Sequence, residues 1–396
     1  MKKNYNSLFL CITLLLSLGL RAQTVPTPDH VVILMMENYG YPDIIGNSNA
    51  PYINSLATDP NAALFTQSYA LSHPSQPNYV MLYSGNNQGI TNDNTPSGTP
   101  FTTCNLGASL IANGKTFTAF SEGLPSVGSL ASTSGSYARK HCPWTNWQGT
   151  GTNQVPPTVH QKFSSFPTST TYSTLPNVSF VIPNLSDDMH DPTSSTAPST
   201  YSVTAITNGD AWVSANLNSY VQWAKTHNSL LILTFDEDDG SIGVGTNQIT
   251  TIFIGQMVQG GQYSEHIDHY RVLRTIEDMY GITNYCGNSA TSTPITDCWK
   301  STTSISSEAF SEDIEIYPNP TPGSAIISFE NKNNQKADLA IYTISGQLVN
   351  IDQKKISVIA KKESFIVDTG KLTDGVYYCK LTLGEKVITK KLIVSK

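Results

Sequence analysis

Charged residues are scarce in this 396-residue chain, and basic residues are the scarcest of them. Only 13% of the residues are Asp, Glu, Lys or Arg. Between residues 24 and 303, eight Lys or Arg stand against 19 acidic residues. A surface this acidic repels phosphate backbones and anionic lipid headgroups, which argues against non-specific binding to nucleic acid or to an anionic membrane.

Cysteine is also rare. Of the six cysteines, one lies in an apolar segment near the start, and the other five show no CxxC spacing. A zinc site built from cysteine is therefore not expected. In an exported protein disulfides are permitted, and local spacing favours a Cys286–Cys298 pair and then a Cys104–Cys142 pair, which would leave Cys379 unpaired.

Long apolar runs are missing, with one exception. After Lys2 and Lys3, an apolar stretch runs from Leu8 to Leu20. A basic start, a short apolar core and a following small residue are typical of a secretory signal peptide, here residues 1–23. The stretch is too short for a comfortable bilayer span, so we expect a secreted or cell-surface protein with no stable membrane span.

The distribution of charge divides the remaining chain. From Ser304 to the end, 12 Lys are balanced by 11 acidic residues. This tail alternates apolar and polar residues between turn residues, which is typical of an antiparallel β-sandwich. We therefore predict a large domain over 24–300, a polar linker over 301–312 and a small C-terminal β-sandwich over 313–396.

Near-continuous aliphatic runs of strand length predict buried strands in the large domain. These runs are 30–36, 179–184, 229–235 and 249–255. Apolar residues at helical spacing predict helices over 210–228, with Asp210 as N-cap, and over 269–281. Strands that alternate with helices predict a doubly wound α/β fold around a mostly parallel sheet, with sites at the carboxyl ends of the strands.

Acidic and polar residues follow several of these runs directly. The ones that could carry chemistry are Glu37, Asn38, Asp187, Asp188, His190, Asp236 and Glu237, with His269 ahead of the last helix. One acid after a strand is usually a solvated loop residue or a helix cap, but several at one sheet edge repel one another. Because almost no Lys or Arg lies near these clusters, the sequence predicts that a divalent metal ion, of open identity and number, neutralises them.

A candidate nucleophile lies in the stretch SHPSQPNYV. Ser75 precedes a helical pattern and is flanked by Pro74 and Pro77. A hydroxyl at a helix start lies near free N–H groups, which is a favourable place for an anion. Ser75 could equally be a plain N-cap, and Ser72 and His73 are close rivals. No GxSxG motif is present, so the serine-hydrolase elbow is not supported, whereas a metal-bound serine needs no histidine base.

Five segments together resemble the bacterial phosphoesterase family of acid phosphatases and phospholipase C enzymes, in the alkaline-phosphatase-like superfamily. They are VVILMMENYGYPDIIG, SHPSQPNYVMLYSG, FVIPNLSDDMHD, TFDEDDG and HIDHYRVLRTIEDMYGI, in the family's order over about residues 28–285. The resemblance implies a doubly wound sheet and a metal-bound Ser or Thr nucleophile that is transiently phosphorylated. The segment ENYGYPDIIG is nearer the compact acid phosphatase branch than the longer phospholipase C segment.

The resemblance also implies roles for single residues. It assigns the nucleophile to Ser75, and the metal ligands to Ser75 with Glu37, Asn38, Asp236 and Glu237. His190, with Asp187 or Asp188, and His269 match positions that hold a second ion or contact phosphate. The expected catalytic residues are therefore Ser75, Asn38, His190 and His269.

The expected function is hydrolysis of small phosphate monoesters through a phosphoserine. A phosphodiesterase or phospholipase C is the close alternative, and a non-catalytic surface-binding protein on the same scaffold is the distant one. The tail segments YPNPTPGSAIISFE, IYTISGQLV and TGKLTDGVYYCKL resemble the C-terminal sorting domain of the type IX secretion system. That likeness implies the secretion machinery as a partner, export across the outer membrane and removal of the tail. The alternative, a carbohydrate-binding or adhesive sandwich, would require exposed aromatic residues, which are sparse.

Overall fold

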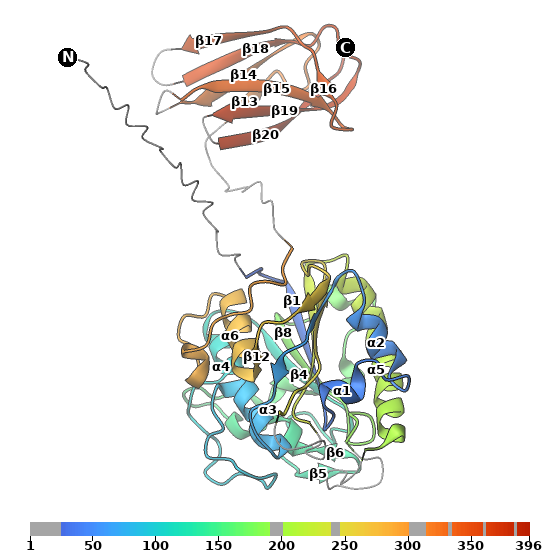
Figure 1. Cartoon of the computed structure of the whole chain (residues 1–396). Helices are drawn as coiled ribbons and strands as arrows, with labels where there is room; N and C mark the ends of the chain where they lie inside the picture. Colours follow the sequence, from blue (N-terminus) through green and yellow to red (C-terminus); the bar gives the residue numbers. More distant parts are fainter. Residues whose placement is uncertain are drawn as a thin grey trace, which may run out of the picture. The chain divides into compact units, whose positions relative to one another are not determined.

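Apolar residues alternate between the two sides of strand β1 (His30–Met36), which lies at the centre of the larger unit in the computed structural model of the chain (Figure 1). Its odd-numbered residues from Val31 to Met35 join one hydrophobic core, and its even-numbered residues from Val32 to Met36 join a second. A strand that is buried on both faces is what a sheet covered by helices on both sides requires.

The structure describes residues 25–190, 201–238, 246–300, 314–331, 335–358, 362–383 and 386–396. They form two compact units that divide between Ser301 and Thr302. The predicted signal peptide (1–23) and the predicted linker (301–312) lie outside the described residues.

The larger unit has an eight-stranded sheet in the order β11-β2-β10-β9-β1-β8-β4-β7. β1 pairs in parallel with β9 and β8, and β4 continues the parallel part between β8 and β7, while β10 runs antiparallel to β9 and β2. The other strands are β2 (Ala62–Phe65), β4 (Phe117–Ser121), β7 (His160–Lys162), β8 (Val178–Ile182), β9 (Ser229–Phe235), β10 (Thr251–Gly255) and β11 (Gly261–Tyr263). The prediction of a mostly parallel sheet, with its four named strands, is confirmed.

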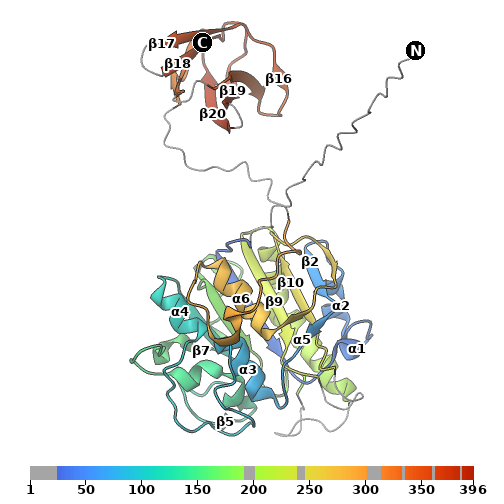
Figure 2. The same cartoon turned by 60° about the vertical axis from the view of Figure 1, so that its left-hand side comes forward.

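Helices cover both faces of this sheet (Figures 1 and 2). Residues of α3, α4 and α6 pack into the core on one face, and residues of α1, α2 and α5 pack into the core on the other. Their bounds are α1 (Tyr41–Ile44), α2 (Pro51–Ala57), α3 (Ser75–Ser84), α4 (Leu106–Ala112), α5 (Val203–Ala224) and α6 (His269–Met279). Two short two-stranded ribbons, β3 (Ser68–Tyr69) with β12 (Ile267–Asp268) and β5 (Thr133–Ser134) with β6 (Tyr137–Ala138), lie outside the main sheet. The doubly wound α/β prediction is therefore confirmed.

The predicted start of helix α5 is wrong. The helix begins at Val203, and its N-cap is Ser202, whose hydroxyl accepts a hydrogen bond from Ala205 N. Asp210 lies inside the helix, and its carboxylate accepts hydrogen bonds from the backbone N–H groups of Tyr52 and Ile53 at 3.0 and 2.8 Å. Asp210 thus satisfies free N–H groups at the start of α2 rather than of its own helix.

The predicted disulfides are also wrong. Cys104 is bonded to Cys286, which lies 182 residues away in the sequence. Cys142 and Cys298 are free and buried, as is Cys379 in the smaller unit. Local spacing failed as a guide because the fold brings the start of α4 against the segment after α6, and no short-range pattern records that contact.

The smaller unit contains two four-stranded antiparallel sheets, β13-β14-β18-β17 and β16-β15-β19-β20. Apolar residues of both sheets share one core. The strands are β13 (Glu315–Tyr317), β14 (Ser324–Glu330), β15 (Ala337–Thr343), β16 (Leu348–Val349), β17 (Gln353–Val358), β18 (Lys362–Asp368), β19 (Gly375–Leu383) and β20 (Lys386–Val394). Among the helices of the described residues, none has the length and apolar character needed to cross a bilayer.

The role of Asp210 can be tested by the variant Asp210→Ala. Loss of its carboxylate leaves two N–H groups of α2 without partners, so the free energy of unfolding should fall by about 1–3 kcal/mol. Urea unfolding followed by circular dichroism measures the change. The exposed Asn208 of the same helix supplies the control, and Asn208→Ala should change stability by less than about 0.5 kcal/mol. Equal effects of the two substitutions would contradict the assignment.

Candidate functional site

The candidate site forms where β1, β8 and β9 end. Asp236 N donates to Met36 O at 3.0 Å, and Glu37 N donates to Asp188 O at 2.8 Å. Asn38 N donates to the Asp236 carboxylate at 3.1 Å. The first of these bonds continues the β1–β9 pairing, and the three bonds together hold three acids from separate parts of the sequence at one edge.

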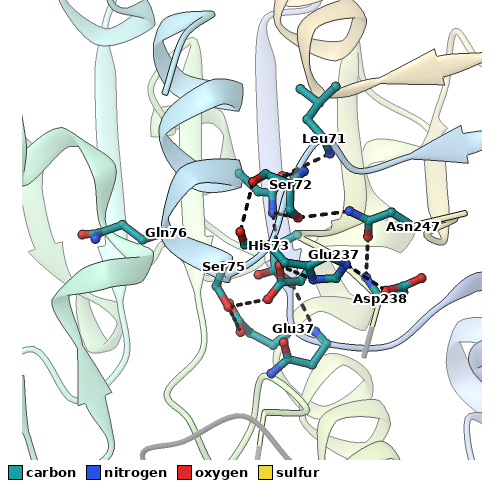
Figure 3. A network of polar contacts seen from close by, with 12 residues as sticks. Glu37, Leu71, Ser72, His73, Ser75, Gln76, Glu237, Asp238 and Asn247 are labelled. Carbon is teal, nitrogen blue, oxygen red and sulfur yellow. Dashed lines mark hydrogen bonds and ion pairs between the residues drawn. The ribbon is translucent and has the colours of Figure 1, made fainter. Parts of the chain in front are cut away.

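Ser75 completes this cluster from the first turn of α3. Its Oγ lies 3.0 Å from Glu37 Oε2 and 3.1 Å from Glu237 Oε1 (Figure 3). The serine is only 1% exposed. Because a hydroxyl carries a single hydrogen, it can donate to only one of the two carboxylates at a time.

Hydrogen bonds from Asn78 fix the backbone segment that precedes Ser75. Asn78 Oδ1 accepts from the backbone N–H groups of Leu71 and Ser72, both at 3.1 Å, and Asn78 Nδ2 donates to Ser72 O. The N-cap position of α3 is Pro74, so Ser75 is the first helical residue. The alternative that Ser75 is a plain N-cap is therefore wrong, and its hydroxyl faces the carboxylates instead.

Burial raises the pKa values of three of the acids. The pKa of Asp236 lies well above its usual range, because burial and the neighbouring Glu37 and Glu237 carboxylates all disfavour its charge. Burial likewise raises the pKa of Glu237, and it raises that of Asp188 to about 6. This edge of the sheet therefore requires cations if its acids are to be ionised together.

Glu37 is the exception, and His141 is the cause. Burial alone would raise the pKa of Glu37, but the His141 imidazole holds it well below its usual range. His141 Nε2 lies 3.0 Å from Glu37 Oε1, and its Nδ1 lies 3.3 Å from Asp188 Oδ2. Although burial opposes the charge, these carboxylates raise the pKa of His141 to about 9. His141 is thus a buried imidazolium between two acids.

A second imidazolium, that of His73, lies on the solvent-exposed side of the cluster. His73 Nδ1 lies 2.8 Å from Glu237 Oε2, and its Nε2 lies 3.2 Å from Asp238 Oδ1 (Figure 3). Hydrogen bonds with Asp238 and Glu237 raise the pKa of His73 to about 10. Because nearly half of this side chain is exposed (46%), solvent reaches the cluster from this side.

The two predicted histidines lie near the cluster in different settings. His190 is buried beside Asp188, its Nε2 lies 3.5 Å from Lys140 Nζ, and burial lowers its pKa to about 4. His269 Nε2 lies 2.8 Å from the backbone oxygen of Asp236, and burial lowers its pKa as well. Asp187 differs from the rest, since its carboxylate accepts from Asn184 Nδ2 and none of its described contacts is with Ser75.

Asn38 has an unusual conformation for a buried residue. Its φ is 56°, in the left-handed region that Asn tolerates better than most residues. Its side-chain Nδ2 is buried and has no hydrogen-bond partner among the described residues. A strained residue with an unused buried donor is a feature of sites that bind an anion or a developing negative charge.

Lys140 and His141 are the functional candidates that sequence reasoning missed. Both lie in the short 3₁₀ helix Arg139–His141, far in sequence from every acid cluster. The expectation that almost no basic residue would lie near the acids was therefore wrong. The only available signal was the run Arg-Lys-His itself, which is conspicuous in a domain so poor in basic residues.

The chemistry of the donor set is compatible with a divalent cation. Carboxylate oxygens of Glu37, Asp236 and Glu237 surround the Ser75 hydroxyl, and Asp236 Oδ2 is buried without a hydrogen bond to any described residue. Oxygen ligands of this kind are preferred by hard cations. Within the described residues, however, no three His, Cys, Asp or Glu side chains are already arranged as a metal site.

Two stretches of the chain match known families. Residues 47–283 match the phosphoesterase family, and residues 315–395 match the secretion system C-terminal sorting domain. The second match confirms the predicted sorting domain and sets aside the carbohydrate-binding alternative.

Two curated relatives are phosphatases by name. The chain is 46% identical over 284 residues to a phosphatidylinositol-3-phosphatase of Mycobacterium tuberculosis, with 71% of this chain and 86% of that protein covered. It is 27% identical over 266 residues to an acid phosphatase of Aspergillus fumigatus, with 62% and 54% covered. The chain thus spans only about half the length of the fungal enzyme.

A solved structure from Vibrio parahaemolyticus, described as a protein in the alkaline phosphatase superfamily, is similar over 95% of this chain and 84% of its own. Its TM-score is 0.47 at 14% sequence identity.

The pairing of Glu37 with His141 can be tested by a double-mutant cycle. His141→Gln leaves Glu37 and Asp188 buried without the imidazolium between them, so unfolding free energy at neutral pH should fall by about 3–5 kcal/mol. Adding Glu37→Gln should restore part of that loss, because the two side chains interact directly. His160, which is equally buried but bonds Ser121 Oγ, provides the control, and His160→Gln should show no such coupling with Glu37→Gln. Strictly additive effects of His141→Gln and Glu37→Gln would refute the ion pair.

Proposed function

This chain belongs to the phosphoesterase family, and from that premise we propose that it is an exported, metal-dependent phosphomonoesterase that works through a phosphoserine at Ser75. Hydrolysis of phosphoric esters follows from the family and its named phosphatases. The observation that carries the finer proposal is the buried Ser75 hydroxyl, held between Glu37 and Glu237 at the start of α3.

Ser75 is the proposed nucleophile, and Glu237 is the proposed acceptor of its proton. His73 holds Glu237 Oε2, which leaves Oε1 directed at the serine oxygen. The pKa of Glu237, raised by burial, makes this carboxylate a stronger base than an exposed one. Glu37 is the weaker candidate, because His141 already holds its charge and lowers its pKa.

Three groups of the chain can stabilise the phosphoryl oxygens. Asn38 offers an unused buried N–H donor, and the positive dipole end of α3 lies at Ser75, the first residue of that helix. Lys140 adds a cation whose charge Glu37 and Asp93 favour. Donors that are positioned before the reaction stabilise the transition state more than the ground state.

The two histidines take different roles in this proposal. His190 gives a proton to the leaving alkoxide as the Ser75–phosphorus bond forms and the ester bond breaks. In the second step it accepts a proton from the water that releases phosphate from Ser75. Because burial lowers the pKa of His190 to about 4, this role requires acidic pH, where the imidazole carries a proton and is a strong donor. His269 holds the backbone of Asp236 and acts as a positioning residue.

The divalent cation would be held by Glu37, Asp236, Glu237 and Ser75. The Asn38 side-chain oxygen and Asp188 are further candidate ligands. Such an ion lowers the pKa of a bound hydroxyl and balances buried carboxylate charge. The proposal is supported by the raised pKa of Asp236, which marks a carboxylate with too little positive charge nearby.

The natural ester and the route of export belong to the same proposal. The name of the mycobacterial relative suggests a phosphorylated inositol lipid headgroup as one substrate to assay.

The alternative of a phosphodiesterase predicts faster turnover of bis-p-nitrophenyl phosphate than of p-nitrophenyl phosphate. The sorting domain implies export to the outer membrane or cell surface, and the segment 1–23 is proposed as the signal that begins it.

The role of Ser75 is tested by Ser75→Ala. The variant should fold normally and lose p-nitrophenyl phosphate turnover by about 10³-fold or more, because among the described residues only the Ser75 hydroxyl bonds both carboxylates. Ser72→Ala is the matched control, since the Ser72 hydroxyl donates to the neighbouring His73 O, and its turnover should stay near wild type. Wild-type turnover by Ser75→Ala would end the proposal.

Metal dependence is tested by dialysis against a chelator. Turnover should fall to background and return on addition of Zn²⁺, Mg²⁺, Mn²⁺ or Ca²⁺, because the carboxylates around Ser75 then regain their counter-charge. Metal analysis of the active protein reports the stoichiometry. Full turnover by protein shown to be metal-free would rule out the cation while leaving the Ser75 nucleophile intact.

A further inference from the structure

A cavity of about 290 Å³ lies beside the candidate site. Gln76, which follows Ser75 in α3, lines it, as does Lys140. The side chain of Gln76 points away from the Glu37 and Glu237 carboxylates that face Ser75 (Figure 3). Lys140 Nζ is also 3.5 Å from His190 Nε2. The cavity therefore adjoins His190, which we propose protonates the leaving oxygen.

Hydroxyl groups line the outer part of this cavity. They belong to Thr95 in the loop after α3, to Ser132 just before β5 and to Thr133 in β5. None of the hydrogen bonds found between described residues uses these three side-chain hydroxyls. Leu185 and Ala138 supply the apolar part of the wall, and no aromatic side chain of the described residues lines it.

Asp93 connects the cavity to the start of α3. Its Oδ1 accepts from Gln76 N at 3.0 Å, and its Oδ2 accepts from Lys140 Nζ at 2.9 Å. Each carboxylate oxygen retains a further acceptor position, and one third of the side chain is exposed. A carboxylate fixed in this way, with hydroxyls around it, is suited to accept hydrogen bonds from adjacent hydroxyls of a ligand.

We propose that this cavity binds the alcohol part of the substrate, and that this alcohol is a small polyol such as a sugar or a cyclitol. The inference rests on the proposed function and names the substrate class of the same site. A polyol presents hydroxyls to Asp93, Ser132 and Thr133 and C–H groups to Leu185. The volume lies near the lower end of pockets that enclose small ligands, about 300–1,000 Å³. A nucleoside would lack an aromatic stacking partner here, and acyl chains would lie outside the cavity.

The test compares myo-inositol 1-phosphate and glucose 6-phosphate with p-nitrophenyl phosphate, using the full chain. The double variant Ser132→Ala/Thr133→Val removes two hydroxyls at nearly constant volume. The ratio of kcat/KM for the polyol phosphates to kcat/KM for p-nitrophenyl phosphate should fall about tenfold, the size of one or two lost hydrogen bonds. This fall should come from a higher KM for the polyol phosphates. Ser134→Ala, at the next position of β5 and therefore on its other side, is the control and should keep the wild-type ratio.

A second measurement does not depend on the folding of the variant. Free myo-inositol should inhibit turnover of p-nitrophenyl phosphate by the wild-type protein, and should do so more weakly in the double variant. An unchanged ratio in the double variant, or turnover of p-nitrophenyl phosphate without turnover of either polyol phosphate, would overturn the polyol proposal and leave the phosphatase proposal standing. No turnover of any ester with any of the four metals would instead overturn the proposed function.

Discussion

The structure depends on one electrostatic constraint, namely that several carboxylates from adjacent strand ends are buried against a single serine. Glu37 and Asp236 follow β1 and β9, which are neighbours in the sheet, and neither carboxylate can move away without breaking the backbone bonds that extend the pairing. Buried like charges are costly unless positive charge is supplied. His141 provides that charge from within, and His73 provides it at the solvent boundary.

The positive charge comes from parts of the chain outside the parallel sheet. His141 and Lys140 lie on a short 3₁₀ helix after the β5–β6 ribbon, and His73 lies in the loop before α3. This division has a physical reason. Strand ends fix the acids rigidly, whereas loops can bring cations and substrate-binding hydroxyls to the same edge without disturbing the sheet. The cavity beside Gln76 is lined in part by the same 3₁₀ helix, so on our proposal substrate choice can change while the acids stay in place.

Most of the fold could be predicted from the sequence, because strands buried on both faces have to be nearly continuous aliphatic runs. Glu37, Asp236 and Glu237 could be predicted as neighbours for the related reason that parallel strands end at one edge. Asp210 was misjudged, since an acid before an apolar helical pattern looks the same whether it caps its own helix or another. The Cys104–Cys286 bond and the approach of His141 to Glu37 depend on tertiary contacts across more than 100 residues, and no local pattern carries that information.

The covalent link between Cys104 and Cys286 encloses a large part of the machinery in one closed loop of the chain. His141, His190, Glu237 and His269 lie inside that loop, whereas Glu37 and Ser75 lie outside it. Exposed loops are the usual places where proteases cut, and an exported protein meets proteases that cytoplasmic proteins do not. A single cut between the two cysteines would leave both fragments joined, so the clipped molecule could keep its acids, cations and serine together. The crosslink therefore keeps the two parts of the chain together after backbone cleavage, which is an effect separate from any gain in folding stability.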